Sequence, residues 1–277
     1  MLLSPRYEGP AVVTIPDAVR SQEEPCTRQR RRLEAMLAGL SADQWAHPSR
    51  CDGWSVRDVI VHLTSVNAFW KVSVERGVAG SPTCFLGAFD PAATPAQMVA
   101  GTPVADPAEV LARFTASNDG FLGAIAALSD DEWTATAESP IGHVPIGLMV
   151  QHALWDSWIH ERDIVLPLGI APVAEPDEVL SCLVYAAAVS PAIGFGFGLS
   201  SPPALAVAAV EPDGLFTIHV GDSVRVEAGA DVDVPCLRGP AVDLAEALSM
   251  RAPMPVDAPI EWIRMRDGVA MAFDAIG

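Results

Sequence analysis

Lysine is almost absent from this sequence of 277 residues, in which Lys71 is the single example. Lysine and arginine together number 17 against 35 aspartate and glutamate residues, which gives a formal net charge of −18. So acidic a chain repels the phosphate backbones of nucleic acids. Its one short basic run, Arg28 to Arg32, is interpreted as the solvated face of a helix. We therefore expect no nucleic-acid partner.

Cysteine is also scarce, and long apolar runs are missing. The five cysteines are scattered without a CxxC pair, which argues against a disulfide framework and against a cysteine-rich zinc site. Prolines and glycines break the most apolar stretch, Val184 to Val207, so no membrane span is expected. The first residues lack the basic and apolar regions of a signal peptide. These absences predict a cytoplasmic protein.

Apolar residues, by contrast, make up 50% of the chain, enough for a large buried core. The pattern along the chain changes after Gly169, from helical periodicity to short strand-like runs. We predict an N-terminal arm over residues 1–16, a helical domain over 17–172 and an α+β domain over 173–277.

Helical periodicity predicts the long helices of the first half. Ser55, followed three residues later by Asp58, resembles a capping box that would begin one of them. The connection from Gly77 to Pro107 is rich in proline and glycine and is expected to be a loop. The expected helices cover Asp17 to Leu40, Ser55 to Trp70, Ala108 to Leu128 and Ile146 to Val165.

Two halves of this region repeat each other. The sequence LSADQW at residues 40–45 matches LSDDEW at residues 128–133, and each is followed by a helix that carries a histidine, His62 or His152. A doubled helix–loop–helix predicts a four-helix bundle, whose core can hold metal ligands from facing helices.

The second half is expected to mix helices and strands. Gly221 and Asp222 would form the turn of a hairpin, and Pro240 would lie near the first position of a helix. The expected helix Asp177 to Val189 is followed by the strands Ala204 to Val210, Leu215 to Val220, Ser223 to Glu227 and, at the end, Val269 to Asp274.

The segment QHALWDSWIHERD, residues 151–163, carries His152, Asp156 and His160 four residues apart. On a helix they form one stripe, and ligands at such spacing can converge on one ion. His62 on the facing helix is the expected third ligand beside Asp156 and His160, and His152 is the alternative to Asp156. Hydrogen-bonded core histidines or a solvated stripe would also explain the residues. The apolar neighbours oppose a solvated stripe, and a buried carboxylate needs a partner.

Three motifs carry a resemblance to a known family: LSADQW, then PSRCDGWSVRDVIVHL, then the D-x-x-x-H-x-x-D of Asp156, His160 and Asp163. The chain resembles the DinB-like bundles, specifically their mycothiol-dependent maleylpyruvate isomerase branch. The resemblance implies a four-helix bundle followed by a small α+β domain of sterol-carrier type. It also implies a divalent metal, expected to be zinc, held by His62, Asp156 and His160, with mycothiol as cosubstrate.

The chain departs from the branch at Asp156, where the branch usually has glutamate. We therefore expect either an S-transferase or a maleylpyruvate-isomerase-like enzyme acting on a small electrophilic metabolite, with S-transfer slightly favoured. The alternatives are a non-catalytic carrier of small molecules or lipids with a vestigial metal site, or a regulator. In the carrier, the apolar segment from Ala192 to Val210 would form the pocket. A monomer or a homodimer is expected.

Further residues are candidates for the site. Asp163 would orient His160 or the substrate, and Arg238 and Arg251 would pair with a carboxylated substrate or the cosubstrate. Trp54, Trp155 and Trp158 would wall the pocket. Each has an ordinary alternative: a helix-end carboxylate, surface arginines or core tryptophans. Cys51 precedes the metal helix, but no basic partner is evident from the sequence, so it is interpreted as structural.

Overall fold

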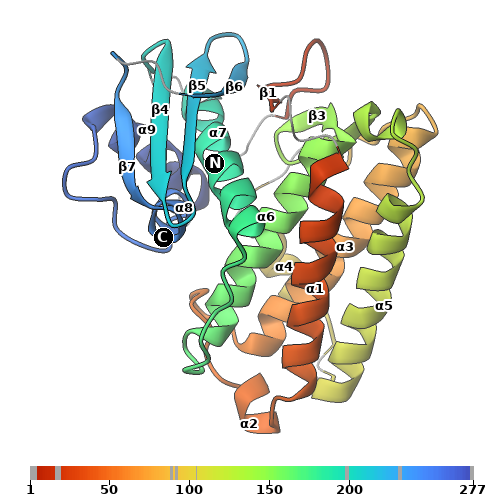
Figure 1. The fold of residues 1–277 in the computed structure, drawn as a ribbon. Coiled ribbons are helices and arrows are strands. Elements are labelled where there is room, and N and C mark those ends of the chain that lie inside the picture. Colours follow the sequence, from red (N-terminus) through yellow and green to blue (C-terminus); the bar gives the residue numbers. More distant parts are fainter. Residues whose placement is uncertain are drawn as a thin grey trace.

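The computed structural model of the protein describes residues 5–15, 20–87, 90, 93–103, 105–196, 200–229 and 233–274. Long helices form a bundle beside a smaller α+β part (Figure 1). The predicted four-helix bundle is confirmed, because the four long helices of the first half pack pairwise against one another. They are α1 (Glu23–Ala38), α3 (Val56–Val78), α5 (Pro107–Ala126) and α6 (Ile146–Val165).

The helix that carries His62 begins as its sequence predicts. The side chain of Ser55 accepts a hydrogen bond from the backbone N–H of Asp58, and the Asp58 side chain accepts one from the backbone N–H of Ser55. This reciprocal capping box satisfies two backbone donors that a helix start leaves without partners. It fixes the start of α3, and with it the position of His62 two turns later.

The repeated LSxDxW segments also adopt related structures. The first forms the short helix α2 (Ala42–Trp45) and the second a 3₁₀ turn, η2 (Glu132–Thr134). Trp45 and Trp133 are both buried. Each repeat therefore buries one tryptophan before the chain enters a histidine-carrying helix.

Two elements of the bundle region were not predicted. Helix α4 (Ala93–Gly101) lies within the connection that was expected to be a loop, and it has no buried residue, so periodicity gave little signal. A two-stranded antiparallel hairpin, β2 (Thr136–Ser139) with β3 (Gly142–Pro145), precedes α6.

The second half is the predicted mixture of helices and strands, and its sheet has the order β1-β6-β5-β4-β7. The predicted hairpin is confirmed as the antiparallel pair β5–β6. Helix α7 lies between this sheet and α6 (Figure 1). The elements are α7 (Pro176–Gly196), β4 (Ala204–Val210), β5 (Gly214–Val220), β6 (Val224–Ala228), β7 (Cys236–Pro240), α8 (Ala241–Leu248) and α9 (Ile260–Asp274).

Part of the expected N-terminal arm belongs to this sheet. Strand β1 (Val13–Thr14) pairs in parallel with β6, and the backbone N–H of Val224 donates to the carbonyl of Val12 at 2.7 Å. Val13 is fully buried. The described residues of the arm are therefore part of the fold, because the side chain of Val13 is buried and β1 pairs with the sheet through β6.

The expected strand Val269 to Asp274 is wrong, since these residues end helix α9. Trp262, Met265 and Val269 are buried at spacings of three and four residues, which is the period of one helix face. The short apolar run at the end of the chain concealed this longer period.

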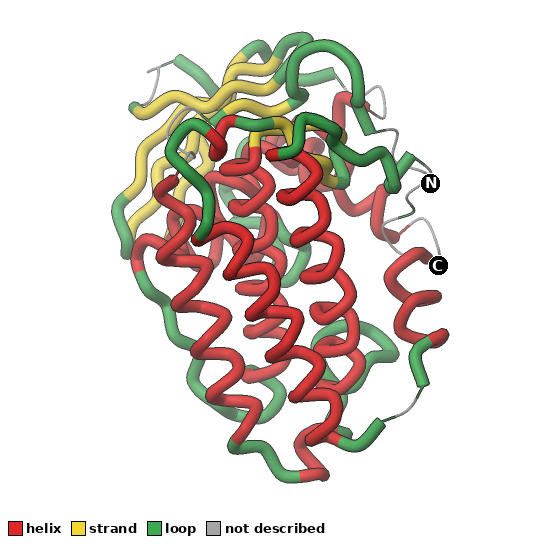
Figure 2. The backbone as a smooth tube through the Cα atoms, turned by 90° about the vertical axis from the view of Figure 1, so that its right-hand side faces the viewer, coloured by secondary structure: helices red, strands yellow, loops and turns green. Residues whose placement is uncertain are grey.

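Helix α7 contains the one candidate membrane span among the described residues, Pro176–Gly194, which sequence reading had not singled out. Its most apolar window is 72% buried inside the protein, as in a core helix. The turned view shows the strands gathered toward one end of the helical body (Figure 2). One hydrophobic cluster joins residues of α6, α7 and the sheet, so the core continues across the predicted boundary at 172–173.

Candidate metal centre

Helices α3 and α6 bring His62, Asp156 and His160 together. Nε2 of His62 lies 3.9 Å and Nε2 of His160 lies 3.7 Å from Oδ1 of Asp156. The two imidazole rings are 5.0 Å apart between centroids and stand edge to face. One ligand atom from each of the three residues lies within 4.8 Å of the others.

The carboxylate of Asp156 is a buried negative charge that a bound cation would neutralise. Its Oδ2 atom is buried and has no hydrogen-bond partner among the described residues. Burial alone would raise the pKa of this carboxyl, but the facing His62 and His160 lower it well below its usual range. The group is therefore a buried anion, which is costly unless paired. Two histidines and one carboxylate are a ligand set typical of catalytic zinc, so the residues present fit a divalent metal.

Asp163 supports His160 from the other side of its ring. An Asp163 carboxylate oxygen lies 3.1 Å from Nδ1 of His160, three residues earlier on α6. Burial would raise the pKa of Asp163, but His160 and Arg251 hold it far below its usual range. Burial alone would lower the pKa of the His160 imidazole, but Cys51 and Asp163 raise it to about 10. A metal ion that binds Nε2 of His160 would therefore compete with a proton for this imidazole.

Two arginines from distant parts of the chain also hold Asp163. Arg251 makes a two-pronged pair, with Nε and Nη2 each 2.9 Å from a carboxylate oxygen, and Nε of Arg50 donates at 3.0 Å. Glu246 on α8 accepts hydrogen bonds from Arg50 and Arg162. These contacts join the second half of the chain to the helix that carries His160. Arg50 and Glu246 were not predicted, and neither lies in a pattern with the histidines.

Cys51 belongs to this network, which corrects its interpretation as a purely structural residue. Its Sγ atom lies 3.6 Å from Nδ1 of His160, 3.2 Å from Oδ2 of Asp163 and 3.7 Å from Nη2 of Arg251. Cys51, His160 and Asp163 also have the geometry of a metal-binding group. Because the guanidinium of Arg251 already pairs with Asp163 there, a cation is better placed on the Nε2 side of His160.

The structure places some of the remaining candidate residues beside the centre and others away from it. The Trp54 ring lies 5.5 Å from the His62 ring and stands beside the centre. Trp158 does not wall the centre as expected: it is fully buried, with the Arg162 guanidinium 4.9 Å from its ring. Arg238 is exposed on β7 and has no contact with the centre among the described residues, whereas Arg251 reaches Asp163.

The imidazole of His152 does not join the three candidate ligands but contacts a different residue. Its Nδ1 atom shares a short hydrogen bond with the hydroxyl of Tyr185 on α7. Between the two candidates for the carboxylate position, the structure thus brings Asp156 to the histidines and leaves His152 one turn away.

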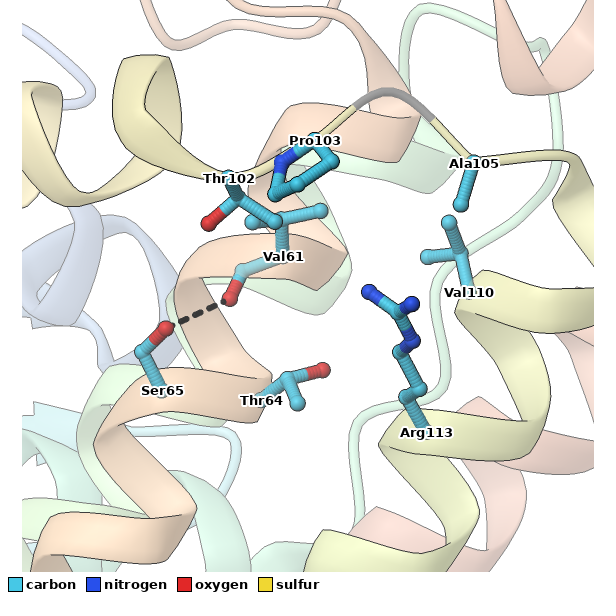
Figure 3. A pocket seen from close by; sticks show the side chains of 8 residues that line it. All are labelled: Val61, Thr64, Ser65, Thr102, Pro103, Ala105, Val110 and Arg113. Carbon is cyan, nitrogen blue, oxygen red and sulfur yellow. Dashed lines mark hydrogen bonds between the residues drawn. The ribbon is translucent and has the colours of Figure 1, made fainter.

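A small pocket lies elsewhere, between α3, α5 and the segment that precedes α5 (Figure 3). Its volume is about 70 Å³, well below the roughly 300 Å³ at which small-molecule sites begin. The Ser65 hydroxyl beside it donates to the carbonyl of Val61 at 3.1 Å. The pocket is lined by Val61, Thr64, Ser65, Thr102, Pro103, Ala105, Val110 and Arg113.

The apolar segment from Ala192 to Val210, the pocket of the alternative carrier function, gives that function no support. Residues 197–199 lie outside the described part of the chain. The following strand β4 has a neighbouring strand on each side in the sheet, and its Leu205 and Val207 are fully buried in the core.

Comparison with known proteins identifies the family and the fold. The family model described as mycothiol maleylpyruvate isomerase N-terminal domain matches residues 26–165. Uncharacterized proteins from two strains of Mycobacterium tuberculosis are 31% identical over 144 residues, 50% of this chain and 52% of theirs. The chain thus spans about half the length of the curated relatives it matches.

Two crystal structures have a similar fold: the mycothiol-dependent maleylpyruvate isomerase and its histidine-to-alanine mutant. The mutant superposes with a TM-score of 0.60 at 12% identity, covering 84% of this chain and 90% of that chain. The other gives a TM-score of 0.59 at 13% identity with the same coverage. The family match covers both helices that carry the histidines and the carboxylate. The chain belongs to the mycothiol maleylpyruvate isomerase N-terminal domain family.

Proposed function

We propose that this protein is a metal-dependent enzyme that uses a low-molecular-weight thiol, mycothiol, to attack a small electrophilic metabolite. The observation that carries the proposal is the meeting of His62, Asp156 and His160, with the second oxygen of the Asp156 carboxylate buried and without a hydrogen-bond partner among the described residues. Family membership supports the thiol, because the family is named for mycothiol.

A divalent metal held by these three residues would stabilise a thiolate over the thiol at neutral pH. The protein's own groups prepare that chemistry. Asp163 holds Nδ1 of His160 and turns Nε2 toward Asp156, which fixes the orientation of the ligand. Arg50 and Arg251 keep Asp163 charged, so it remains a hydrogen-bond acceptor.

The thiolate sulfur forms a bond to an unsaturated carbon, and the electron pair of the carbon–carbon double bond moves onto the adjoining carbonyl as an enolate. If the carbon–sulfur bond breaks again after rotation, the product is the geometric isomer. If the enolate carbon takes a proton instead, the thiol adduct remains. We favour the adduct, because Asp156 replaces the usual glutamate of the isomerase branch and alters the position of the carboxylate.

The test is to incubate the zinc-loaded protein with mycothiol and a panel of unsaturated carbonyl compounds that includes maleylpyruvate. Mass spectrometry would detect thiol adducts, and absorbance would follow isomerisation. We expect adducts that form faster than in buffer and that are lost in His62→Ala. Absence of both thiol binding and product formation in zinc-loaded protein would overturn the proposal.

A further inference from the structure

The end of helix α8 contacts α6 on both sides of the candidate metal ligands. The Ser249 hydroxyl accepts a hydrogen bond of 2.8 Å from the indole Nε1 of Trp155. Two residues later in the chain, Arg251 makes its two-pronged pair with Asp163. Trp155 directly precedes the first candidate ligand of α6, and Asp163 follows the second by three residues. The two contacts therefore enclose the ligand-bearing stretch of α6 between them.

The residue between these contacts, Met250, has a left-handed backbone conformation with a φ of 61°. This conformation is unfavourable for a residue that has a Cβ atom. In the described part of the chain, Glu211 is the only other non-glycine residue with a positive φ. Such conformations persist where the surrounding structure imposes them, and they cluster at functional sites.

The hydrogen bonds at the end of α8 show what the conformation of Met250 achieves. The backbone N–H of Arg251 donates to the carbonyl of Glu246 at 2.8 Å, and that of Met250 donates to the carbonyl of Ala247 at 3.1 Å. This pair of bonds ends a helix through one left-handed residue, which is usually glycine. The chain reverses at that residue, and this reversal lets both Ser249 and Arg251 reach α6.

The side chain of Met250 has a separate role from its backbone. It is partly buried and packs against the hydrophobic cluster that joins α6, α7 and the sheet. A glycine would adopt the same φ more easily but would lose this packing. The packing and the backbone conformation can therefore be tested independently.

The contacting residues of α8 lie outside residues 26–165, the part of the chain that matches the family model. The three candidate ligands all lie inside that part. A third contact from the same end of α8 is the hydrogen bond of 2.6 Å that Glu246 accepts from Arg162 on α6. The second half of the chain thus fixes one side of a centre whose ligands belong to the bundle.

We propose that residues 246–251, which we call the α8 turn, position the ligand-bearing stretch of α6, and that Met250 is the positioning residue. Its left-handed conformation directs Ser249 and Arg251 to their partners. The α8 turn thereby holds Asp156 and His160 in the arrangement that one metal ion needs. The inference rests on the proposed function, because it concerns the same metal centre. It assigns the second half of the chain a part in metal binding.

The test compares two substitutions of Met250 in the full-length protein. Met250→Val disfavours the left-handed conformation, because valine is branched at Cβ, whereas Met250→Gly permits it. Competition with a chromophoric chelator measures the zinc affinity. We expect Met250→Val to lower the affinity about tenfold, as loss of a residue that supports a ligand does. Met250→Gly should stay within about twofold of the unsubstituted protein, because glycine keeps the reversal.

Met254→Val is the matched control. Met254 packs against the same hydrophobic cluster, but its φ is not positive. We expect its zinc affinity to be unchanged. Urea denaturation of all three variants separates positioning from stability. Met250→Gly should lose stability with its packing and still bind zinc, which a merely structural role of Met250 would not allow.

The indole N–H of Trp155 gives a second readout, which does not depend on the metal. Nuclear magnetic resonance of protein with ¹⁵N-labelled tryptophan follows its exchange with water, and Trp155→Phe assigns the signal. We expect exchange at least about tenfold faster in Met250→Val, and unchanged in Met250→Gly, because opening of the local structure exposes the group. If Met250→Val does not fold, Ser249→Ala removes the acceptor alone. It should speed the exchange and weaken zinc binding about threefold, the effect of one hydrogen bond.

Several results would overturn the inference: equal zinc affinities in Met250→Val and Met250→Gly, an equal loss in Met254→Val, or unchanged indole exchange in folded Met250→Val. Unchanged exchange and affinity in Ser249→Ala would overturn it where Met250→Val does not fold. The expected affinities without any thiol chemistry in the unsubstituted protein would support the α8 turn and reject the proposed function. Thiol chemistry together with equal affinities in the two Met250 variants would do the reverse.

Discussion

Asp163 accepts a hydrogen bond from His160 at 3.1 Å while both side chains are buried on the same helix. Because this bond occupies Nδ1, the other nitrogen of the ring faces Asp156 and His62. A carboxylate behind a metal-binding histidine fixes its tautomer and orientation. The pair therefore connects the charge network of Arg50 and Arg251 to the candidate metal centre.

Substitution of Asp163 tests that connection. Asp163→Asn keeps the shape of the side chain but removes the charge behind His160, so we expect zinc affinity to fall about 10- to 100-fold. Competition with a chromophoric chelator measures the affinity. Asp177→Asn is the control, since Asp177 pairs with Arg28, has no hydrogen bond or ion pair with His62, Asp156 or His160 among the described residues, and should leave the affinity unchanged. Circular dichroism must show that the variant is folded, because Arg50 and Arg251 lose a charged partner. Equal zinc affinity in both variants would contradict the role of Asp163.

Removal of either histidine should remove the metal. We expect purified His62→Ala and His160→Ala to hold far less than one zinc per chain by mass spectrometry of the metal, because two ligands remain from three. His219→Ala is the matched control, because His219 lies on β5 and pairs with Glu227. Stoichiometric zinc in His62→Ala or His160→Ala would disprove the ligand set.

Two substitutions at Asp156 test separately the charge of its carboxylate and the length of its side chain. Asp156→Asn removes the charge at constant size and should weaken zinc binding by at least about tenfold, since an amide is a poorer ligand. Asp156→Glu restores the residue typical of the branch and should retain zinc. Titration calorimetry gives both affinities. Tighter zinc binding by Asp156→Asn than by Asp156→Glu would show that Asp156 is not a ligand.

The stability of the metal-free protein should fall as pH falls from about 6.5 to 4. The pKa of His152 is about 4 in the folded protein, against a usual value of 6.5. The unfolded chain therefore binds more protons in this window, and the free energy of unfolding decreases as pH decreases. Urea denaturation at several pH values should show a shallower slope in His152→Phe than in the unsubstituted protein. Parallel slopes would mean that His152 is not held neutral by the fold.

The capping box of α3 should contribute measurably to stability. Ser55→Ala removes the hydroxyl that accepts from the Asp58 N–H, and we expect a loss of about 1 kcal/mol in the free energy of unfolding. Ser81→Ala, at an exposed loop serine, should change it by less than about 0.5 kcal/mol. Chemical denaturation distinguishes the two. A neutral Ser55→Ala would show that the α3 start does not depend on this cap.

Periodicity and capping patterns predicted the elements whose structure is determined by residues close in the sequence. Helix α6 has the bounds expected from its periodicity, and Ser55 caps α3 as its spacing with Asp58 indicates. The strand expected at Val269 failed, because burial of a helix face against the rest of the protein decided that segment. The four-residue spacing of Asp156 and His160 pointed to a common face.

The charge network behind His160 lay beyond sequence reasoning for a different reason. Cys51 and Arg251 are 200 residues apart, and Arg50 and Glu246 are 196 apart. No periodicity links such positions, so only the packing of α8 against the bundle reveals them. The same separation hid the basic partner of Cys51.

The distance along the chain between Asp163 and Arg251, 88 residues, also has a consequence for biosynthesis. A nascent chain releases its helical half from the ribosome first, with Asp163 still lacking its two-pronged counter-charge. The side chains of His62 and His160 can come together at that stage. Asp163 gains its pair with Arg251 only when the segment around Arg251 has been synthesised. Maturation of the centre is therefore expected to wait until the segment that carries Arg251 has been synthesised.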